Sequence, residues 1–215
     1  MESIIFPPNI KKIGSNAFDF QHNAVVVGNF DKLEELGETP FYGKYFDINL
    51  FKNVKIYTTN SFQFMYPRAG KYNLPYITRI FKNMLSNNAN NYTVEELVSN
   101  LVDLSGCTSL ERMDSYGLTL RPLKGENEVT IILPASINYL ESSCMPMYPA
   151  AGQLGVTRVI IKVLATTPPI LVGTNFVADG IIIDKVEIHV PAASVSAYKT
   201  ATNWSYFATR IYPIT

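Results

Sequence analysis

Short apolar runs that end at a proline recur along this chain. The first, residues 4–14, is an apolar run followed by a proline and then by isolated isoleucines. Residues 131–141 repeat the same order at a constant offset of 127 residues, which takes Pro7 to Pro134. A strand this short cannot bury its apolar face alone, so it must stack on the equivalent strand of a neighbouring repeat. Proline fits at the strand boundary, where no ladder donor is needed. The pattern therefore predicts the rungs of a solenoid.

A second pattern places one apolar residue at every third position. Residues 30–37 and 107–114 share it, and both predict a tight turn that leads into a strand. We interpret residues 156–161 as a third copy and residues 53–57 as a partial fourth. Because the copies differ in spacing, we expect a short and irregular solenoid rather than an even horseshoe.

The middle of the chain has a helical period. Residues 74–85 carry apolar side chains on one helix face, and Pro75 suits the first turn. After a polar loop, residues 93–96 form a capping box that begins a second helix ending at Leu104. We therefore predict a helical hairpin inserted at about residues 74–104. Two roles remain open for it, packing onto the solenoid and docking to another protein.

Aromatic residues are dense between residues 44 and 72. Phe62, Phe64 and Tyr66 alternate with other residues, which is typical of a strand. Both core packing and an exposed interface are open for this stretch, because only a contiguous exposed patch would indicate an interface.

The last stretch, residues 185–215, opens with a strand-like alternation that Pro191 stops. Ser194 is placed to cap a short helix, and several aromatic residues follow before the end. Exposed termini are usually polar and frayed, so a terminus this aromatic needs something to cover. A stacked-repeat domain needs a cap at its end. We predict such a cap at about residues 185–215, in preference to a simple helix docked on a core.

The ending also carries a resemblance. Residues 190–204, VPAASVSAYKTATNW, followed by the I-x-P-I of residues 211–214, resemble the C-terminal ending of BspA-like leucine-rich-repeat proteins. The similarity is closest over Val156–Ile214 and looser over residues 1–18 and 107–144. Proteins of that family occur on the surfaces of gut and oral bacteria and in phages of such bacteria. The resemblance implies an α+β, leucine-rich-repeat-like β-solenoid whose surface recognises other molecules without catalysis.

Composition limits the possible partners. The chain has 215 residues and is expected to form one domain over residues 1–215. Its formal net charge is zero and its longest basic run is Lys11–Lys12, which argues against nucleic-acid binding. No apolar stretch reaches the length of a membrane span, so membrane insertion is not expected. The first residues lack a secretory signal pattern, so we expect either processing from a precursor or export inside a particle.

Catalytic chemistry is not expected. The two histidines, His22 and His189, have no partner at metal-ligand or general-base spacing, and no hydrolase or phosphate-binding motif is present. Cys107 and Cys144 are interpreted as two small buried thiols. The carboxylate pairs at residues 34–35, 95–96 and 126–128 suit turns, a helix start and a polar loop. We therefore predict no enzyme activity, cofactor or metal.

The expected function is structural or recognitional. We favour a phage virion component, tail-associated or part of a fibre, that contacts other virion proteins or a host-cell protein or glycan. A bacterial surface adhesin module is the alternative, and a cytosolic interaction domain is a third. Thr130, Glu187 and His189 are candidates for an exposed repeat face. The ligand and the oligomeric state within an assembly stay open.

Overall fold

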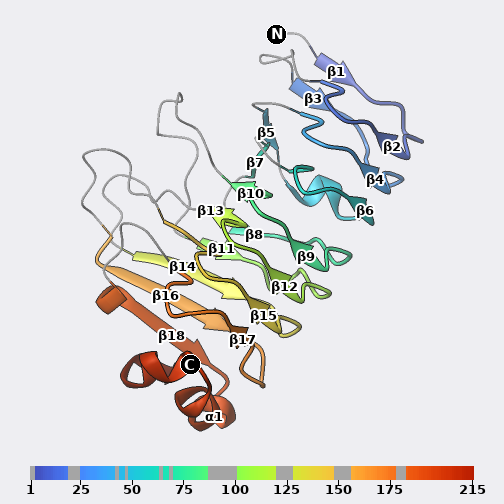
Figure 1. Cartoon of the computed structure of the whole chain (residues 1–215). Coiled ribbons are helices and arrows are strands. Elements are labelled where there is room, and N and C mark those ends of the chain that lie inside the picture. The colour runs from blue at the N-terminus through green and yellow to red at the C-terminus, as the bar shows by residue number, and fades with distance from the viewer. Residues whose placement is uncertain are drawn as a thin grey trace.

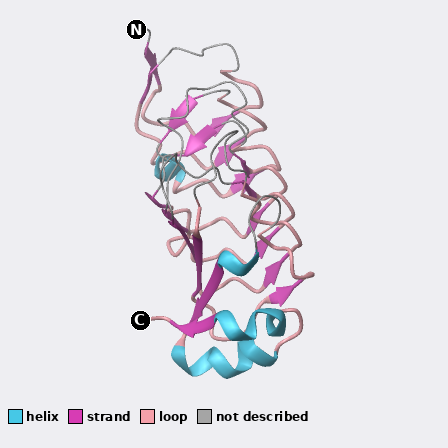
Figure 2. Ribbon diagram, turned by 90° about the vertical axis from the view of Figure 1, so that its left-hand side faces the viewer, coloured by secondary structure: helices cyan, strands magenta, loops and turns pink. Residues whose placement is uncertain are grey.

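The computed structural model describes residues 3–18, 25–41, 44–46, 48–62, 65–67, 70–86, 101–119, 128–147, 156–177 and 183–215. In these residues, short parallel strands are stacked rung upon rung from the N-terminus to the C-terminus (Figure 1). Most helical segments gather at the C-terminal end of the stack, and η1 (Ile48–Phe51) lies apart from them (Figure 2). The coarse prediction of a solenoid-like stack of parallel strands is confirmed.

Each rung opens with a strand on one side of the stack. These strands are β1 (Ser3–Ile5), β3 (Val25–Val27), β5 (Lys44–Phe46), β7 (Met65–Pro67), β8 (Gly70–Lys71), β11 (Leu101–Asp103), β14 (Glu128–Leu133), β16 (Arg158–Val163) and β18 (Val186–Val190). The final strand, β19 (Ile211–Pro213), joins β18, so β8, β11, β14, β16, β18 and β19 form one six-stranded parallel sheet. Nearer the N-terminus, β1 pairs with β3 and β5 pairs with β7.

A second side is made of two-residue strands. They are β2 (Lys12–Ile13), β4 (Glu35–Leu36) and β6 (Ile56–Tyr57) in a three-stranded sheet, then β9 (Arg79–Ile80), β12 (Arg112–Met113), β15 (Tyr139–Leu140) and β17 (Ile170–Leu171) in a four-stranded sheet. A further pair, β10 (Leu85–Ser86) and β13 (Leu118–Thr119), follows two of these rungs. In the three-stranded and four-stranded sheets the second residue of each strand is buried, except Tyr57 of β6, which is half-buried.

One turn recurs before these short strands. The N–H of Leu33 donates to the carbonyl of Phe30 at 2.9 Å, and Leu110 does the same to Cys107 at 3.0 Å. The turns that end at Ile10, Val54, Ile77 and Ile137 have the same bond. An apolar residue at every third position therefore marks a turn whose side chains enter the core, as predicted for residues 30–37, 107–114 and 53–57.

A left-handed corner recurs after the same strands. Three residues past the inward residue, φ lies between 43° and 61° at Asn16, Thr39, Asn83, Tyr116 and Ser143. The N–H group of each donates to a carbonyl of the following rung, at 2.8 to 3.0 Å. Asparagine tolerates this conformation, whereas threonine and tyrosine rarely adopt it. The hydrogen-bonded stack therefore imposes the corner on residues that disfavour it.

The predicted helix over residues 74–85 is wrong. The N–H of Ile77 bonds to the carbonyl of Leu74 in the recurring turn, and β9 then pairs Ile80 with Met113 of β12. Spacings of three suit a helix face and this turn equally well. Pairing with the next rung decides between them, because an isolated helix of this length is marginal in water.

The second predicted helix of the hairpin is also not found where it can be tested. Residues 101–103 form β11, and Leu104 turns into the core. The rest of that prediction, residues 93–100, lies outside the described residues. Residues 156–161 are a further correction, since Val159 pairs with Val129 of β14 on the first side of the stack. Residues 158–161 belong to the long strand β16 and not to a third copy of the turn.

The core changes character along the stack. Phe6, Phe30, Phe41, Phe51 and Phe62 form a chain of ring contacts near the N-terminus, with centroids 5.1 to 6.0 Å apart. Between Leu74 and Leu171 the buried core is aliphatic apart from two cysteines and four methionines. Among the aromatic residues of residues 44–72 whose side chains are described, Phe51, Phe62 and Tyr72 are buried. For these three, the core interpretation is confirmed.

The predicted C-terminal cap is present. After β18 the chain forms η4 (Ala192–Ser194), α1 (Val195–Thr200) and η5 (Trp204–Arg210) before β19. Tyr198, Trp204 and Phe207 are fully buried, and Phe176 of the last rung contacts the rings of the latter two at 5.7 and 5.4 Å. Ser194 precedes α1, but its hydroxyl donates to the carbonyl of Thr166 at 2.7 Å and does not cap the helix.

Candidate functional site

The outer face of the six-stranded sheet carries the side chains that alternate with the core. In β14, Val129, Ile131 and Leu133 are buried, so the residues between them point outward. The strand register sets these outward residues in rows across the sheet. One row is Leu101, Thr130, Ile160 and Glu187, and the next is Asp103, Ile132, Lys162, His189 and Tyr212.

Arg158 organises the charges on this face. Its guanidinium donates to both carboxylate oxygens of Glu187, at 2.8 and 2.7 Å, and to Glu128 at 2.9 Å. The hydrogen bonds to Glu187, and then those to Glu128, raise the pKa of Arg158. The hydrogen bond from Arg158 lowers the pKa of Glu187. Because the guanidinium is planar, this two-point contact fixes both side chains in one geometry.

His189 points to the same face. Its neighbours Ile188 and Val190 are fully buried, which resolves the facing that the sequence left open. The Nε2 atom lies 3.3 Å from a carboxylate oxygen of Glu187, and the ring centroid lies 5.6 Å from that of Tyr212. The structure therefore brings two of the three candidates, Glu187 and His189, into contact. Thr130 lies two strands away in the same row as Glu187.

This face mixes charge with apolar surface. Leu101, in β11, and Tyr212, in the edge strand β19, are each 40% exposed. Ile160, between them, is only 8% exposed. A rigid parallel sheet with carboxylate, guanidinium, imidazole and phenol groups in fixed rows offers hydrogen bonds and apolar contacts to an extended partner.

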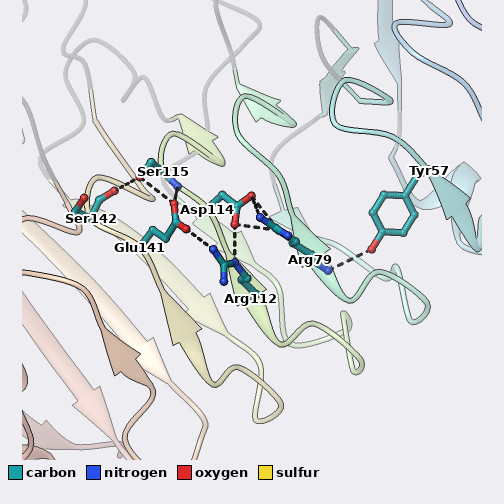
Figure 3. A network of polar contacts seen from close by, with 7 residues as sticks. All are labelled: Tyr57, Arg79, Arg112, Asp114, Ser115, Glu141 and Ser142. Carbon is teal, nitrogen blue, oxygen red and sulfur yellow. Dashed lines mark hydrogen bonds and ion pairs between the residues drawn. The ribbon is translucent and has the colours of Figure 1, made fainter.

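The four-stranded sheet carries a second polar network on its outer face (Figure 3). Asp114, largely buried, accepts hydrogen bonds from Arg79 Nε at 2.9 Å and from Arg112 Nε at 2.8 Å. Arg112 Nη2 forms an ion pair with Glu141, whose other oxygen accepts from Ser115 N at 3.0 Å. The network therefore links three successive rungs.

Aromatic rings complete this network. The Arg112 guanidinium lies 4.3 Å from the Tyr139 ring centroid, and that of Arg79 lies 4.8 Å from Phe81. The hydrogen bond to Asp114 is the main cause that raises the pKa of Arg112. Sequence reasoning missed the ion pairs Arg79–Asp114 and Arg112–Glu141, because the two partners of each pair are 35 and 29 residues apart in the chain. Only the register of the rungs reveals that these positions adjoin. The arrangement braces the stack.

A joint interrupts the second side between β6 and β9. The carbonyls of Lys11, Glu34, Thr78 and Glu111 each accept from two successive N–H groups of the next rung. At the joint, the Tyr57 hydroxyl oxygen accepts instead, from Thr78 N at 2.8 Å and from Arg79 N at 3.2 Å. A side chain therefore takes the place of a backbone carbonyl where the three-stranded and four-stranded sheets meet.

The remaining chemical candidates have structural contacts. Cys107 and Cys144 are free and buried, as predicted. Burial raises the pKa of Cys107 to about 11 and also raises the pKa of Cys144. Glu34 and Glu35 form ion pairs with lysines of neighbouring rungs. His22 and the carboxylates at 95, 96 and 126 lie outside the described residues.

Neither a cluster of metal-binding side chains nor a membrane-spanning helix occurs among the described residues. Within the described part of the chain, no group of three or more histidine, cysteine or acidic side chains is arranged to hold a metal ion. None of the helices described has the length and apolar character that crossing a bilayer requires. The fold is thus that of a parallel-stranded, solenoid-like repeat protein with an aromatic C-terminal cap. In comparisons with known proteins, no family model and no curated protein matches the chain.

Proposed function

We propose that this protein is a non-catalytic recognition or structural component of a phage particle, in a tail or fibre. The observation that supports it is the outer face of the six-stranded sheet, where side chains from five consecutive rungs and the cap lie in register. Repeat solenoids use extended surfaces of this kind to hold partners, because each rung adds contacts without changing the scaffold.

The chemistry of the face favours a polar partner, a protein or a glycan. Arg158 and Glu187 hold each other in place, which lowers the entropy that binding would otherwise cost. Tyr212 adds an exposed ring beside His189. Aromatic rings flanked by hydrogen-bonding groups suit both protein hot spots and the apolar faces of sugars.

Mass spectrometry of purified virions tests the particle assignment. The protein is expected among the virion proteins at a copy number that stays constant between preparations. Its absence from particles that retain the other tail proteins would overturn the assignment. A Tyr212→Ala variant is expected to reduce incorporation or host attachment, with Tyr206→Ala, an exposed tyrosine of the cap, as the matched control.

A bacterial surface adhesin module is the second candidate. It is favoured by the resemblance of Val156–Ile214 to the ending of BspA-like surface proteins. Surface biotinylation of intact cells that carry the gene tests it, because an adhesin is labelled and a virion component made in the cytosol is not. The neighbouring genes, tail genes in one case and export genes in the other, separate the two directly.

A further inference from the structure

Around the short strands, backbone N–H groups point towards the preceding rung. On this second side of the stack, they donate to carbonyls of the rung before, except at β9, where the Tyr57 hydroxyl accepts instead. Glu34 and Glu35 N–H donate to Lys11 O at 2.9 and 3.1 Å, and Gly37 N–H donates to Ile13 O at 2.8 Å. The equivalent donors of the first rung are the N–H groups of residues 11, 12 and 14. No residue in the described ranges accepts a hydrogen bond from them.

The opposite end of the stack is sealed by side chains. The carbonyls of Pro169 and Leu171 occupy the positions of Asn138 and Leu140 in the rung before, which accept from backbone N–H groups. Trp204 Nε1 donates to Pro169 O and Asn203 Nδ2 donates to Leu171 O, both at 2.7 Å. The cap therefore supplies the donors that a further rung would supply. At the first rung, no described residue supplies the matching acceptors.

Charge alternates along the same side. Lys12 of the first rung pairs with Glu35 of the second, and Glu34 of the second pairs with Lys55 of the third. The positions of Lys11 and Lys12 in the first rung thus correspond to those of Glu34 and Glu35 in the second. Opposite charges in neighbouring strands are favourable and like charges are not. The next strand outward from the first rung is therefore favoured when it is acidic.

We propose that the outer edge of β2, where no described residue accepts from the backbone, binds an extended acidic segment of a partner protein as an added rung. Two carbonyls of that segment accept from the N–H groups of residues 11, 12 and 14, and one of its carboxylates pairs with Lys11, since Lys12 already pairs with Glu35. This is strand addition to an exposed edge, in which the main chain supplies affinity and the side chains supply specificity. The inference rests on the proposed recognition role and names the class of partner for one part of the surface.

A second copy of the chain is a poor occupant. Pairing β2 with its own symmetry mate would bring Lys11 and Lys12 of both copies together, which is unfavourable. The experiment therefore uses a peptide. Residues 31–38, DKLEELGE, already lie against this ladder from the other side, and they carry four acidic residues and one lysine. A fluorescent copy of this peptide is the probe, and anisotropy with the full chain at low salt is the measurement.

Gly14→Pro tests the backbone contact because proline has no N–H to donate. Gly14→Ala is its matched control, since a Cβ at Gly14 meets nothing within 4 Å. We expect the proline variant to weaken peptide binding at least tenfold and the alanine variant to bind as the parent does. Circular dichroism of both variants verifies that the fold is retained.

Lys11→Glu tests the charge contact without altering the backbone. It is expected to weaken binding at least fivefold, whereas Lys199→Glu, on the exposed helix of the cap, leaves binding unchanged. A peptide with lysine at each acidic position is expected not to bind. The proposal is overturned if the acidic peptide does not bind the parent chain, if Gly14→Pro binds it equally well, or if sedimentation shows that this edge pairs with a second copy. These assays use purified protein, so they stand apart from the virion test.

Discussion

The indole Nε1 of Trp204 donates a 2.7 Å hydrogen bond to the carbonyl of Pro169, 35 residues earlier in the chain. Both residues are buried, and the indole also packs against the ring of Tyr198 at 5.0 Å. One side chain therefore closes the hydrophobic core and satisfies one of the two carbonyls of the last rung that the cap covers. A purely apolar cap would cover the core but leave that carbonyl unpaired.

Trp204→Phe is expected to lower the free energy of unfolding by about 1–3 kcal/mol, because Pro169 O loses its donor while ring packing is largely kept. Urea unfolding followed by circular dichroism measures the change. Tyr206→Phe, at a tyrosine that is 55% exposed, is the control and should leave the midpoint unmoved. Equal midpoints for both variants would show that the hydrogen bond contributes nothing.

Tyr57→Phe is expected to open the joint between β6 and β9. The N–H groups of Thr78 and Arg79 lose their acceptor, so their amides should exchange faster with solvent while distant rungs stay protected. The cost in stability is expected to be about 1 kcal/mol. Hydrogen exchange read by mass spectrometry checks the location, with Tyr76→Phe as the control at a neighbouring exposed tyrosine. Unchanged exchange at residues 78–79 would contradict the bridging role.

Thr39→Asn is expected to stabilise the fold. Thr39 has φ of 43°, which a β-branched residue disfavours, whereas Asn16 and Asn83 occupy the equivalent corners of other rungs. Relief of this strain should add about 0.5–1 kcal/mol and raise Tm. Scanning calorimetry measures it, and Thr167→Asn at an exposed site without positive φ is the control. A lower Tm for Thr39→Asn would mean that its side chain makes a contact worth more than the strain.

Asp114→Asn is expected to destabilise the stack by about 2 kcal/mol, since two arginines lose a shared carboxylate that is largely buried. Asp31→Asn is the comparison, because Asp31 pairs with Lys52 at 3.6 Å on an exposed turn. Such surface pairs contribute about 0–1 kcal/mol. Chemical unfolding of both variants at low and high salt separates the two cases. A smaller loss for Asp114→Asn than for Asp31→Asn would refute the bracing role.

Chemical labelling of the Cys107 thiol should require unfolding of the chain. Burial raises the pKa of Cys107 from 9.0 to about 11, so the folded thiol stays protonated and unreactive at pH 8. Because the pKa is raised, stability is fully present below pH 9.0 and declines as pH rises towards about 11. Reaction with a chromogenic disulfide at pH 8 should therefore require urea. Rapid labelling of the native chain would show that the thiol is accessible.

Local patterns were sufficient for the repeat and for its ending. The spacing of three that joins Phe30, Leu33 and Leu36 identifies a turn and a strand, and the aromatic ending identifies a cap. The same spacing at Leu74, Ile77 and Ile80 wrongly predicted a helix, because a helix face shares it. Nothing within residues 74–85 separates the two, since the deciding contact is with Met113 in another rung.

The sequence alone determined the rung, because the residues of one turn lie close together in the chain and carry their own apolar order. The tertiary structure decided how rungs meet: the left-handed corner at Tyr116, the charge network around Asp114, and the outward row that joins Glu187 to Thr130. Those relationships depend on register between strands 21 to 33 residues apart, and register is set by stacking in three dimensions.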